Sequence, residues 1–517
     1  MKKYILLFAA LLMGVSMNAQ ENAQGTIKEG GIDAEHATQL TGEETQPLTL
    51  STGWFVVNKD VSYSSTITLS GDVHLILNDG CTMNVGTSSN RVSGRGIYGG
   101  ATSSLTIYGQ TNGTGLLSVF TTDPDNDHIS AIRVDNTYTQ NGGNVHVDNA
   151  GTSYGIQCVN FTIFGGTIDA TSSNNGSAIY GSATVTFSGG TVTANRIGEG
   201  VGDGISTSSS GRIILAGGTV TASSYFGTVQ IADGYTYFDG NKASASFKDL
   251  DMTKTLRPVL LDDVSNTAVI EALNGQTLGS VVINGRTLYK DGKWNTLCLP
   301  FDVDLTIDGS ALYGATARTL TAASITDNTL NLTFGDAVTT LAAGTPYIIK
   351  WDKDIDNPTI VNPVFKNVTI SKATHNVTVE NVLTFTGTYD LVPISSAGDN
   401  TKLYLGSDNK LYWPNGEMTI KCQRAYFQLA DGITAGDPTN PNTVPVRAFN
   451  LNFGDDETNV ITPLALWRGA GGEASEAWYT LDGRRLSGKP TAKGLYLHST
   501  SGRLQKVIIG HHHSPDE

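Results

Sequence analysis

Apolar and polar residues alternate in three closely similar stretches of the chain. They read "FTIFGGTIDA" from Phe161, "VTFSGGTVTA" from Val185 and "IILAGGTVTA" from Ile213. A period of two is typical of a β-strand that buries one face. Each stretch therefore predicts two short strands joined by a Gly-Gly pair. We expect the glycines to turn the corner with backbone angles that a Cβ would penalise.

The same pattern recurs at a regular step. Gly-Gly pairs begin at 142, 165, 189 and 217, so the steps are 23, 24 and 28 residues. A second short motif, with isoleucine at its second position, recurs at similar steps as "AIRV" from 131, "GIQC" from 155, "AIYG" from 178 and "GIST" from 204. One such unit cannot bury its own apolar side, whereas stacked units can. The sequence predicts an all-β fold with a right-handed parallel β-helix (solenoid) over residues 50–245. The alternative is a sandwich of antiparallel hairpins, which would not need the same residue at the same place in each repeat.

The repeat ends before about residue 255. Beyond it, stretches in which apolar and polar residues alternate are separated by short sequences typical of turns. Hairpins are predicted at "INGRTL" from 283, "KDGKW" from 290 and "YLGSDNKLYW" from 404. We therefore expect antiparallel β-sandwich structure over 255–455 and a small β-domain over 460–510.

The first twenty residues have the layout of a secretory signal peptide. Lys2 and Lys3 precede a short apolar run, and Ala19 suits cleavage, so residues 1–19 are predicted to be removed on export. The polar segment 20–49 is expected to cover the open end of the solenoid. Export permits disulfides, but no particular pairing of the four cysteines is predicted, and Cys158 is interpreted as a buried free thiol.

The composition narrows the function. A formal net charge of -15 argues against nucleic acid, whose phosphates attract basic surfaces. No Ser/His/Asp signature, zinc spacing or phosphate-binding loop is present. The repeats hold few ionisable groups and many Thr, Ser and Gly, which favours binding over catalysis, and no catalytic residue is nominated.

A candidate carbohydrate-binding row follows the repeated isoleucine. Its members are Tyr98, Arg133, Gln157 and Tyr180, and Ser206 has the same place in the next repeat. Neighbouring strands lie about 4.8 Å apart, so Tyr98 and Tyr180 are expected roughly 14 Å apart. Aromatic faces and planar polar groups in a row suit an extended glycan. The alternative is an exposed row of side chains that binds nothing.

A candidate calcium site lies in "TTDPDNDH". The step from "GIYG" at 96 to "AIRV" at 131 is 35 residues, so some eleven extra residues form a loop. Asp123, Asp125 and Asp127 alternate there and offer the oxygen ligands that Ca²⁺ prefers. The pattern of an EF-hand is not completed, and a plain polar loop is the alternative.

Two segments resemble parts of proteins exported by bacteria with type IX secretion. "KWNTLCLPFDV" from Lys293 and "QRAYFQLADG" from Gln423 are similar to a domain of such proteins, covering about 285–455. Residues 481–485, 493–496 and 506–507 resemble the type IX C-terminal sorting domain. The resemblance implies a secreted or outer-surface location and the type IX machinery as a partner.

The repeat region resembles bacterial β-helix carbohydrate-binding proteins, some of them linked to polygalacturonate and Ca²⁺. The leading hypothesis is a non-enzymatic, surface-displayed protein that binds a polysaccharide or a host glycan, or acts as an adhesin. One alternative is a polysaccharide lyase or glycoside hydrolase on a pectate-lyase-like scaffold, in which Ca²⁺ would acidify a uronate and Arg133 would act as base. Another is a structural surface spacer.

Overall fold

The computed structural model describes residues 37–110, 112–123, 129–173, 175–436 and 444–452, and short strands between 20 and 28 and between 462 and 509. The predicted signal peptide, 1–19, lies outside these residues. The chain divides into two compact units, Met1–Val259 and Leu260–Glu517. The described part is nearly all β, with one short α-helix, α2 (Thr267–Ala272), and one 3-10 turn (Phe247–Asp249), which confirms the all-β prediction.

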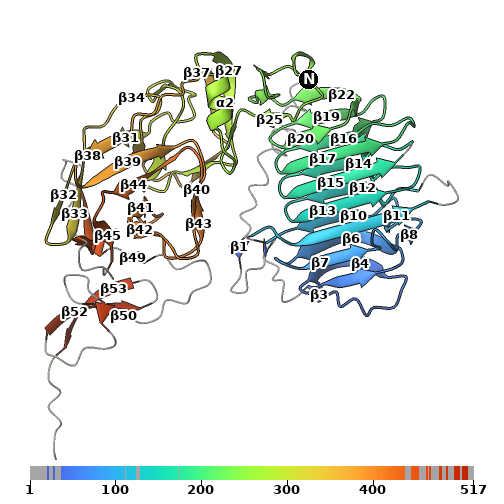
Figure 1. Cartoon of the computed structure of the whole chain (residues 1–517), viewed down its shortest axis with the longest axis horizontal. Helices are drawn as coiled ribbons and strands as arrows, with labels where there is room; N and C mark the ends of the chain where they lie inside the picture. Colours follow the sequence, from blue (N-terminus) through green and yellow to red (C-terminus); the bar gives the residue numbers. More distant parts are fainter. Residues whose placement is uncertain are drawn as a thin grey trace, which may run out of the picture. The chain divides into compact units, whose positions relative to one another are not determined.

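The first unit is built on two large sheets of parallel strands (Figure 1). The 12-stranded sheet holds β3 (Thr38–Gln39), β4 (Thr49–Val57), β6 (Ile67–Leu77), β9 (Ile97–Gly99), β10 (Ser104–Tyr108), β12 (Ile132–Gln140), β14 (Ile156–Ile163), β16 (Ile179–Phe187), β18 (Ile205–Thr207), β19 (Arg212–Leu215), β21 (Tyr225–Phe226) and β22 (Thr228–Ile231). The 8-stranded sheet holds β5 (Val61–Tyr63), β7 (Thr82–Val85), β8 (Val92–Ser93), β11 (Leu116–Thr122), β13 (Asn144–Asn149), β15 (Thr167–Ser173), β17 (Thr191–Ile197) and β20 (Thr219–Ala222).

The pairing follows the sequence repeat. Phe161 on β14 lies opposite Tyr138 on β12 and Val185 on β16, so equivalent residues of successive repeats are neighbours. The antiparallel alternative for this region is therefore wrong. Within each of the two sheets, every pair of neighbouring strands is parallel. Between most neighbouring strands of one sheet the chain passes through a strand of the other sheet, and such a crossover connection allows parallel pairing.

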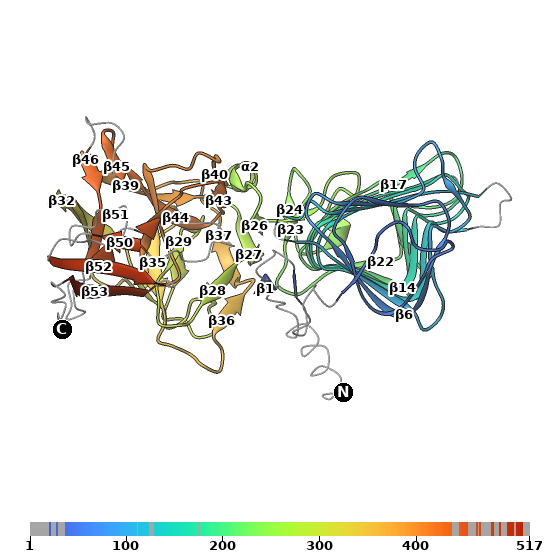
Figure 2. The same cartoon turned by 90° about the horizontal axis from the view of Figure 1, so that it is seen from below.

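Inward-facing side chains fill the space between the sheets. Phe161 and Phe187 are fully buried, and the rings of Tyr138 and Phe161 stack with centroids 5.2 Å apart. Figure 2 shows the stacked strands of the two sheets from nearly along the stack, and the core residues come from both sheets. The alternating burial on β14 and β16 matches the period-two pattern in the sequence.

The Gly-Gly pairs make the predicted corners. The second glycine of three pairs, Gly143, Gly166 and Gly190, has a positive φ of 74°, 79° and 68°. A Cβ on Gly166 would lie 2.0 Å from the carbonyl oxygen of Gly143 on the preceding repeat. The corner therefore excludes a side chain both by its backbone angle and by the close approach of its neighbour.

Segments before and after the repeats contact the two large sheets or join their core. At the start, β3 pairs with β4, and Leu40 and Leu48 join the core, while the role of segment 20–49 as an end cover stays a prediction. At the other end, the Tyr237 hydroxyl accepts a hydrogen bond from the Gly217 amide and donates one to the Gly218 carbonyl. Leu256 forms an antiparallel bridge with Val220. Strands β23 (Tyr237–Phe238), β24 (Ala243–Ser244) and β25 (Arg257–Pro258) form a small sheet in this segment.

The four cysteines are free. Cys158 is buried as predicted, and burial raises the pKa of its thiol well above the ordinary range. Burial likewise raises the pKa of Cys298 and Cys422, each to about 12. These thiols stay protonated at neutral pH and act as small core side chains.

The second unit is made of small, mostly antiparallel sheets around its own core. Its strands include β26 (Leu260–Leu261), β27 (Thr277–Asn284), β28 (Thr287–Tyr289), β29 (Asn295–Leu297), β30 (Val303–Asp304), β31 (Thr316–Arg318), β32 (Leu320–Thr326), β33 (Thr329–Phe334), β34 (Thr340–Leu341), β35 (Tyr347–Lys350), β36 (Thr359–Val361) and β37 (Val364–Thr369). They continue with β38 (Val377–Val379), β39 (Leu383–Thr388), β40 (Val392–Ile394), β41 (Lys402–Leu405), β42 (Leu411–Trp413), β43 (Met418–Ile420), β44 (Arg424–Leu429), β45 (Ile433–Ala435), β46 (Val444–Val446) and β47 (Ala448–Asn452). Phe385 and Phe427 stack at the centre, 4.6 Å between centroids.

One of the three predicted hairpins is confirmed and two are wrong. β41 and β42 pair antiparallel around "GSDNK", with Tyr404 opposite Tyr412. At 283 and 290 the chain does turn, but β27 pairs with β37, β28 with β36 and β29 with β35. The local turn signal is genuine there, and the partner strand comes from elsewhere in the chain.

The last strands are β48 (Thr462–Pro463), β49 (Ala465–Leu466), β50 (Ala477–Tyr479), β51 (Arg485–Leu486), β52 (Gly494–Thr500) and β53 (Arg503–Ile509). The last four form one antiparallel sheet in the order β51-β50-β52-β53. No helix within the described residues is long and apolar enough to cross a membrane.

Candidate functional site

The four residues proposed for carbohydrate binding lie in one row across the first unit. Arg133 on β12 is the register partner of both Tyr98 on β9 and Gln157 on β14, and Gln157 is the partner of Tyr180 on β16. Ser206 on β18 continues the row. Each follows a buried isoleucine, so strand alternation turns its side chain to the outer face. We call Tyr98, Arg133, Gln157 and Tyr180 the column.

A second row, which the sequence analysis missed, lies beside the column. Its members precede those of the column by three residues, and we call Arg95, Ser130, Tyr154 and Ser177 the flanking row. Their shared spacing in the aligned repeats is the signal that could have found them.

Each member of the flanking row contacts the column or its continuation. The Arg95 guanidinium lies 4.7 Å from the centre of the Tyr98 ring, a cation–π contact. The Ser130 hydroxyl donates to Gln157 Oε1 at 2.6 Å. The Ser206 hydroxyl, which continues the column, donates to Ser177 Oγ at 2.7 Å. The two rows therefore hold one another in place.

The aromatic part of this surface is a stacked pair. The rings of Tyr154 and Tyr180 lie 4.5 Å apart between centroids with planes 16° apart. Burial raises the pKa of Tyr154, with a smaller contribution from Tyr180, so its hydroxyl is protonated at neutral pH and can donate a hydrogen bond. Both tyrosines are half-buried, and an aromatic ring with a hydroxyl group is a combination that a sugar ring with its own hydroxyls can meet.

The polar members of the column are oriented by their neighbours. Arg133 Nε donates to Asp135 Oδ1 at 2.6 Å, and Gln157 is fixed through Ser130. All four side chains of the column are half-buried. A ligand would meet groups whose rotamers are already restricted, which lowers the entropy lost on binding.

The row continues beyond the predicted residues to Phe226. Phe226 on β21 is the register partner of Ser206, and 56% of it is exposed. Two strand steps separate it from Tyr180, a distance of about 10 Å. Phe226 was not predicted because no further copy of the repeated motif follows "GIST" in the sequence, although β21 still pairs in register.

Of the predicted calcium ligands, only Asp123 lies within the described residues. It is buried, and its Oδ2 accepts hydrogen bonds from the Ile129 amide at 3.2 Å and the Thr152 hydroxyl at 3.4 Å. These bonds close the base of the loop. Asp125 and Asp127 lie outside the described part, and no group of three or more potential metal ligands is found within it. The calcium site stays a prediction.

Charged side chains also gather on the outer face of the 8-stranded sheet. His146 Nδ1 lies 3.1 Å from Asp169 Oδ2, and Arg91 Nη2 donates to Asp148 Oδ2 at 2.6 Å. Arg91 also lies over the ring of Phe120, 5.7 Å from its centre. These groups are paired with one another, and we assign them no catalytic role.

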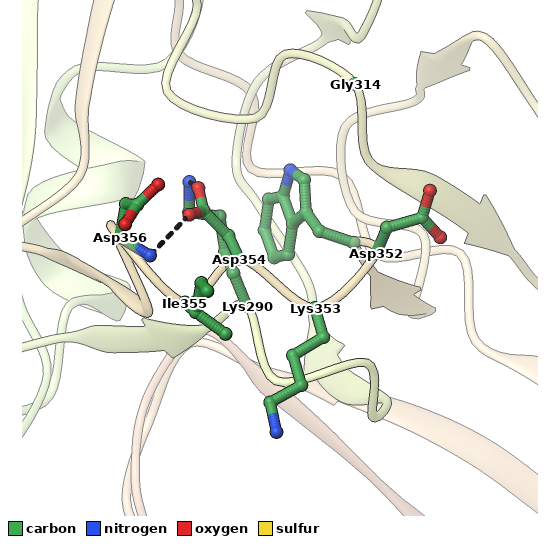
Figure 3. Close-up of a pocket in the computed structure, with 8 residues that line it drawn as sticks. Lys290, Gly314, Asp352, Lys353, Asp354, Ile355 and Asp356 are labelled. Carbon is green, nitrogen blue, oxygen red and sulfur yellow. Dashed lines mark hydrogen bonds and ion pairs between the residues drawn. The ribbon is translucent and has the colours of Figure 1, made fainter.

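An open hollow of about 420 Å³ lies in the second unit, beside the loop 351–358. Lys290 Nζ holds Asp354 Oδ2 at 2.5 Å, and the other oxygen of Asp354 accepts the amides of Asp356 and Asn357. Figure 3 shows the carboxylates of Asp352 and Asp356 pointing to opposite sides. The alternating aspartates therefore do not converge on a common ligand position.

Comparison of the chain with protein-family models, with curated proteins and with solved structures finds no match.

Proposed function

We propose that residues 50–245 form a right-handed parallel β-helix whose outer face binds an extended glycan, and that the protein is a non-enzymatic, surface-displayed or secreted glycan-binding protein. The parallel, in-register pairing of strands about two dozen residues apart supports the β-helix. The regions 255–455 and 460–510 are proposed to be β-sandwich structure and a sorting-like β-domain. The antiparallel sheets of the second unit and the sheet of β50 to β53 support these assignments.

One observation carries the binding proposal. Arg133 pairs in register with Tyr98 on one side and with Gln157 on the other, and Gln157 pairs with Tyr180. Two tyrosines therefore lie three strand steps apart, roughly 14 Å, with two planar polar groups between them. A linear polymer of sugar units running across the strands would meet these groups in succession.

The contacts within the surface favour binding over catalysis. Gln157 and Arg133 are each engaged by a neighbouring polar group, and Tyr180 is braced by Tyr154. Pre-organised hydrogen-bonding and aromatic groups of this kind recognise hydroxyls and sugar faces without a reactive group. A hydrolase would instead need two carboxylates at a defined separation across the scissile bond.

A glycan array with neutral and uronate polysaccharides tests the proposal on the purified full chain. Binding is expected for wild type and is expected to be lost in the Tyr98→Ala, Tyr180→Ala double variant. Phe164→Ala is the matched control, because Phe164 is an aromatic residue of the same unit, 43% exposed, that lies outside the column. Binding that survives the double variant, or no binding at all, overturns the assignment.

The same preparation separates the alternatives. A polysaccharide lyase would produce unsaturated uronate that absorbs in the ultraviolet when Ca²⁺ is added. A spacer would bind no glycan and produce no such signal. Surface labelling of cells that express the chain, with and without residues 460–510, tests the proposed type IX export and outer-surface location.

A further inference from the structure

The second unit holds a buried carboxylate that is surrounded by three cations. Asp262 follows β26, and its side chain is only 2% exposed. Arg424, at the start of β44, binds both of its oxygens, with Nη2 3.2 Å from Oδ2. Lys421 Nζ lies 3.4 Å from Oδ2, and Arg286 Nη1 lies 4.0 Å from Oδ1.

The positive charge of this cluster exceeds its negative charge. Three cations and one carboxylate sum to +2 at neutral pH. The Asp390 carboxylate also lies in this region, since it and Asp262 both contribute to raising the pKa of Cys422 after burial. Asp390 is already bound by the hydroxyls of Ser265 and Thr267. Even with Asp390 counted, the sum is +1.

Arg286 is the most buried of the three cations, with 4% of the residue exposed. Its Nη2 donates to the Thr296 carbonyl at 2.8 Å, whereas its Nε has no hydrogen-bond partner within the described residues. Burial, followed by the charge of Arg424, lowers the pKa of Arg286 to about 9, so it remains a cation at neutral pH. A buried cation with an unused donor is unfavourable unless a further anion offsets it.

Two of the three cations are partly exposed to solvent. The side chain of Lys421 is 46% exposed and that of Arg424 is 24% exposed, whereas the side chains of Arg286 and Asp262 are buried. An anion arriving from solvent would meet an ammonium and a guanidinium first, with a second guanidinium adding to the field. Arginine and lysine together are the usual partners of phosphate, sulfate and carboxylate groups.

We propose that Lys421, Arg424 and Arg286 form an oxyanion-binding site in the second unit. Its ligand is a phosphate, sulfate or carboxylate group, either free or carried by a larger molecule. The site is separate from the column and does not depend on glycan binding there. The competing explanation is that the cluster has a structural role alone and holds together the ends of β26 and β44, two strands that are far apart in the chain.

Isothermal titration calorimetry of the full chain with sodium phosphate, sodium sulfate and sodium acetate, at ionic strength matched with sodium chloride, tests the proposal. Saturable binding of at least one anion is expected, and the arms separate tetrahedral anions from carboxylates. Lys421→Gln is expected to weaken binding about tenfold, the loss of one charge-assisted contact. Lys372→Gln is the matched control, because Lys372 is an exposed lysine of the same unit, paired with Glu271 at 3.2 Å.

No binding by the wild type, or equal weakening in both lysine variants, overturns the proposal. The Asp262→Asn variant adds a second test, because it should strengthen the effect of the anion where Lys421→Gln should weaken it. Removing this carboxylate raises the excess positive charge, so the anion that binds the wild type is expected to raise the Tm of Asp262→Asn by more than it raises that of wild type. A purely structural tie predicts a lower Tm that the anion does not restore, and that result also contradicts the site. If Asp262→Asn does not fold, the pair of lysine variants decides.

Discussion

Tyr154 and Tyr180 stack with ring centroids 4.5 Å apart, although one precedes β14 and the other lies on β16. Gln157 on β14 is the register partner of Tyr180, and this pairing brings the two rings together. The contact therefore depends directly on the parallel register of the first unit, and it belongs to the surface proposed to bind glycan.

A double-mutant cycle on Tyr154 and Tyr180 tests this stack. The two alanine substitutions are expected to show a coupling energy of about 0.5–1.5 kcal/mol, the usual range for an aromatic pair beyond its burial. The free energy of unfolding of the four proteins, measured in urea, gives the coupling. Additive effects, within about 0.3 kcal/mol, would contradict a direct contact between the rings.

Replacing an aromatic residue of the core is expected to lower the free energy of unfolding far more than replacing one at the surface. Phe161 is fully buried and contacts the rings of Tyr138 and Phe187, so Phe161→Ala should cost about 3–5 kcal/mol. Phe164, three residues later, is 43% exposed, and Phe164→Ala should cost less than about 1 kcal/mol. Urea denaturation measures both. Similar costs would mean that the inward and outward faces are assigned wrongly.

The corner at Gly166 is expected to tolerate no side chain. Its φ is 79°, and an added Cβ would meet the carbonyl oxygen of Gly143 at 2.0 Å. Gly166→Ala should therefore cost more than about 2 kcal/mol, through backbone strain and displacement of the neighbouring repeat. Gly100→Ala is the control, since its nearest contact, the Tyr98 hydroxyl, is 4.0 Å away. Thermal unfolding that ranks the two variants equally would refute this account of the corner.

The start of the first unit is expected to lose stability in acid through Glu44. Burial favours the neutral acid, but hydrogen bonds from Thr41 and the Tyr63 hydroxyl outweigh it and lower the pKa of Glu44 from 4.5 to about 2. Because the folded-state pKa lies below the unfolded value, this stabilisation is present above pH 4.5 and is lost as the pH falls toward 2.

Urea midpoints measured between pH 6 and pH 2.5 check the role of Glu44. The wild type should lose more stability over this range than Glu44→Gln, which cannot titrate. Glu43→Gln is the control, because Glu43 is exposed and neighbours Glu44 in sequence. Parallel curves for wild type and Glu44→Gln would exclude this carboxylate as the cause.

The calcium prediction is best tested at Asp125. Asp123 already accepts hydrogen bonds from Ile129 and Thr152, so its replacement would disturb the loop base whether or not calcium binds. Calorimetric titration with Ca²⁺ is expected to show weaker binding for Asp125→Asn than for wild type. Identical curves, or no heat in either protein, would remove the calcium site.

The hairpins of the second unit show where prediction from sequence stops. "GSDNK" between β41 and β42 encodes both a turn and the pairing of the strands beside it. At Gly285 and Gly292 the turn is equally well encoded, with φ of 86° and 82°, yet the flanking strands pair with β35, β36 and β37. A turn is a local property, whereas a strand takes the partner that buries its apolar face best.

The repeat of apolar residues and glycines predicted the strands of the repeated segments, their inward faces, the glycine turns between them and the row from Tyr98 to Tyr180, while it left an antiparallel arrangement open. The period of two gives the buried face of each strand, and the recurrence about two dozen residues apart brings equivalent residues side by side once the strands pair in parallel. Only the tertiary structure decided that Tyr154 braces Tyr180, that Phe226 extends the row, and that Asp262 gathers Arg286, Lys421 and Arg424. The charged contacts around Asp262 join residues whose spacing follows no repeat, whereas the contact of Tyr154 with Tyr180 and the place of Phe226 depend on how neighbouring strands pair in register. Each of them forms only when the chain has packed.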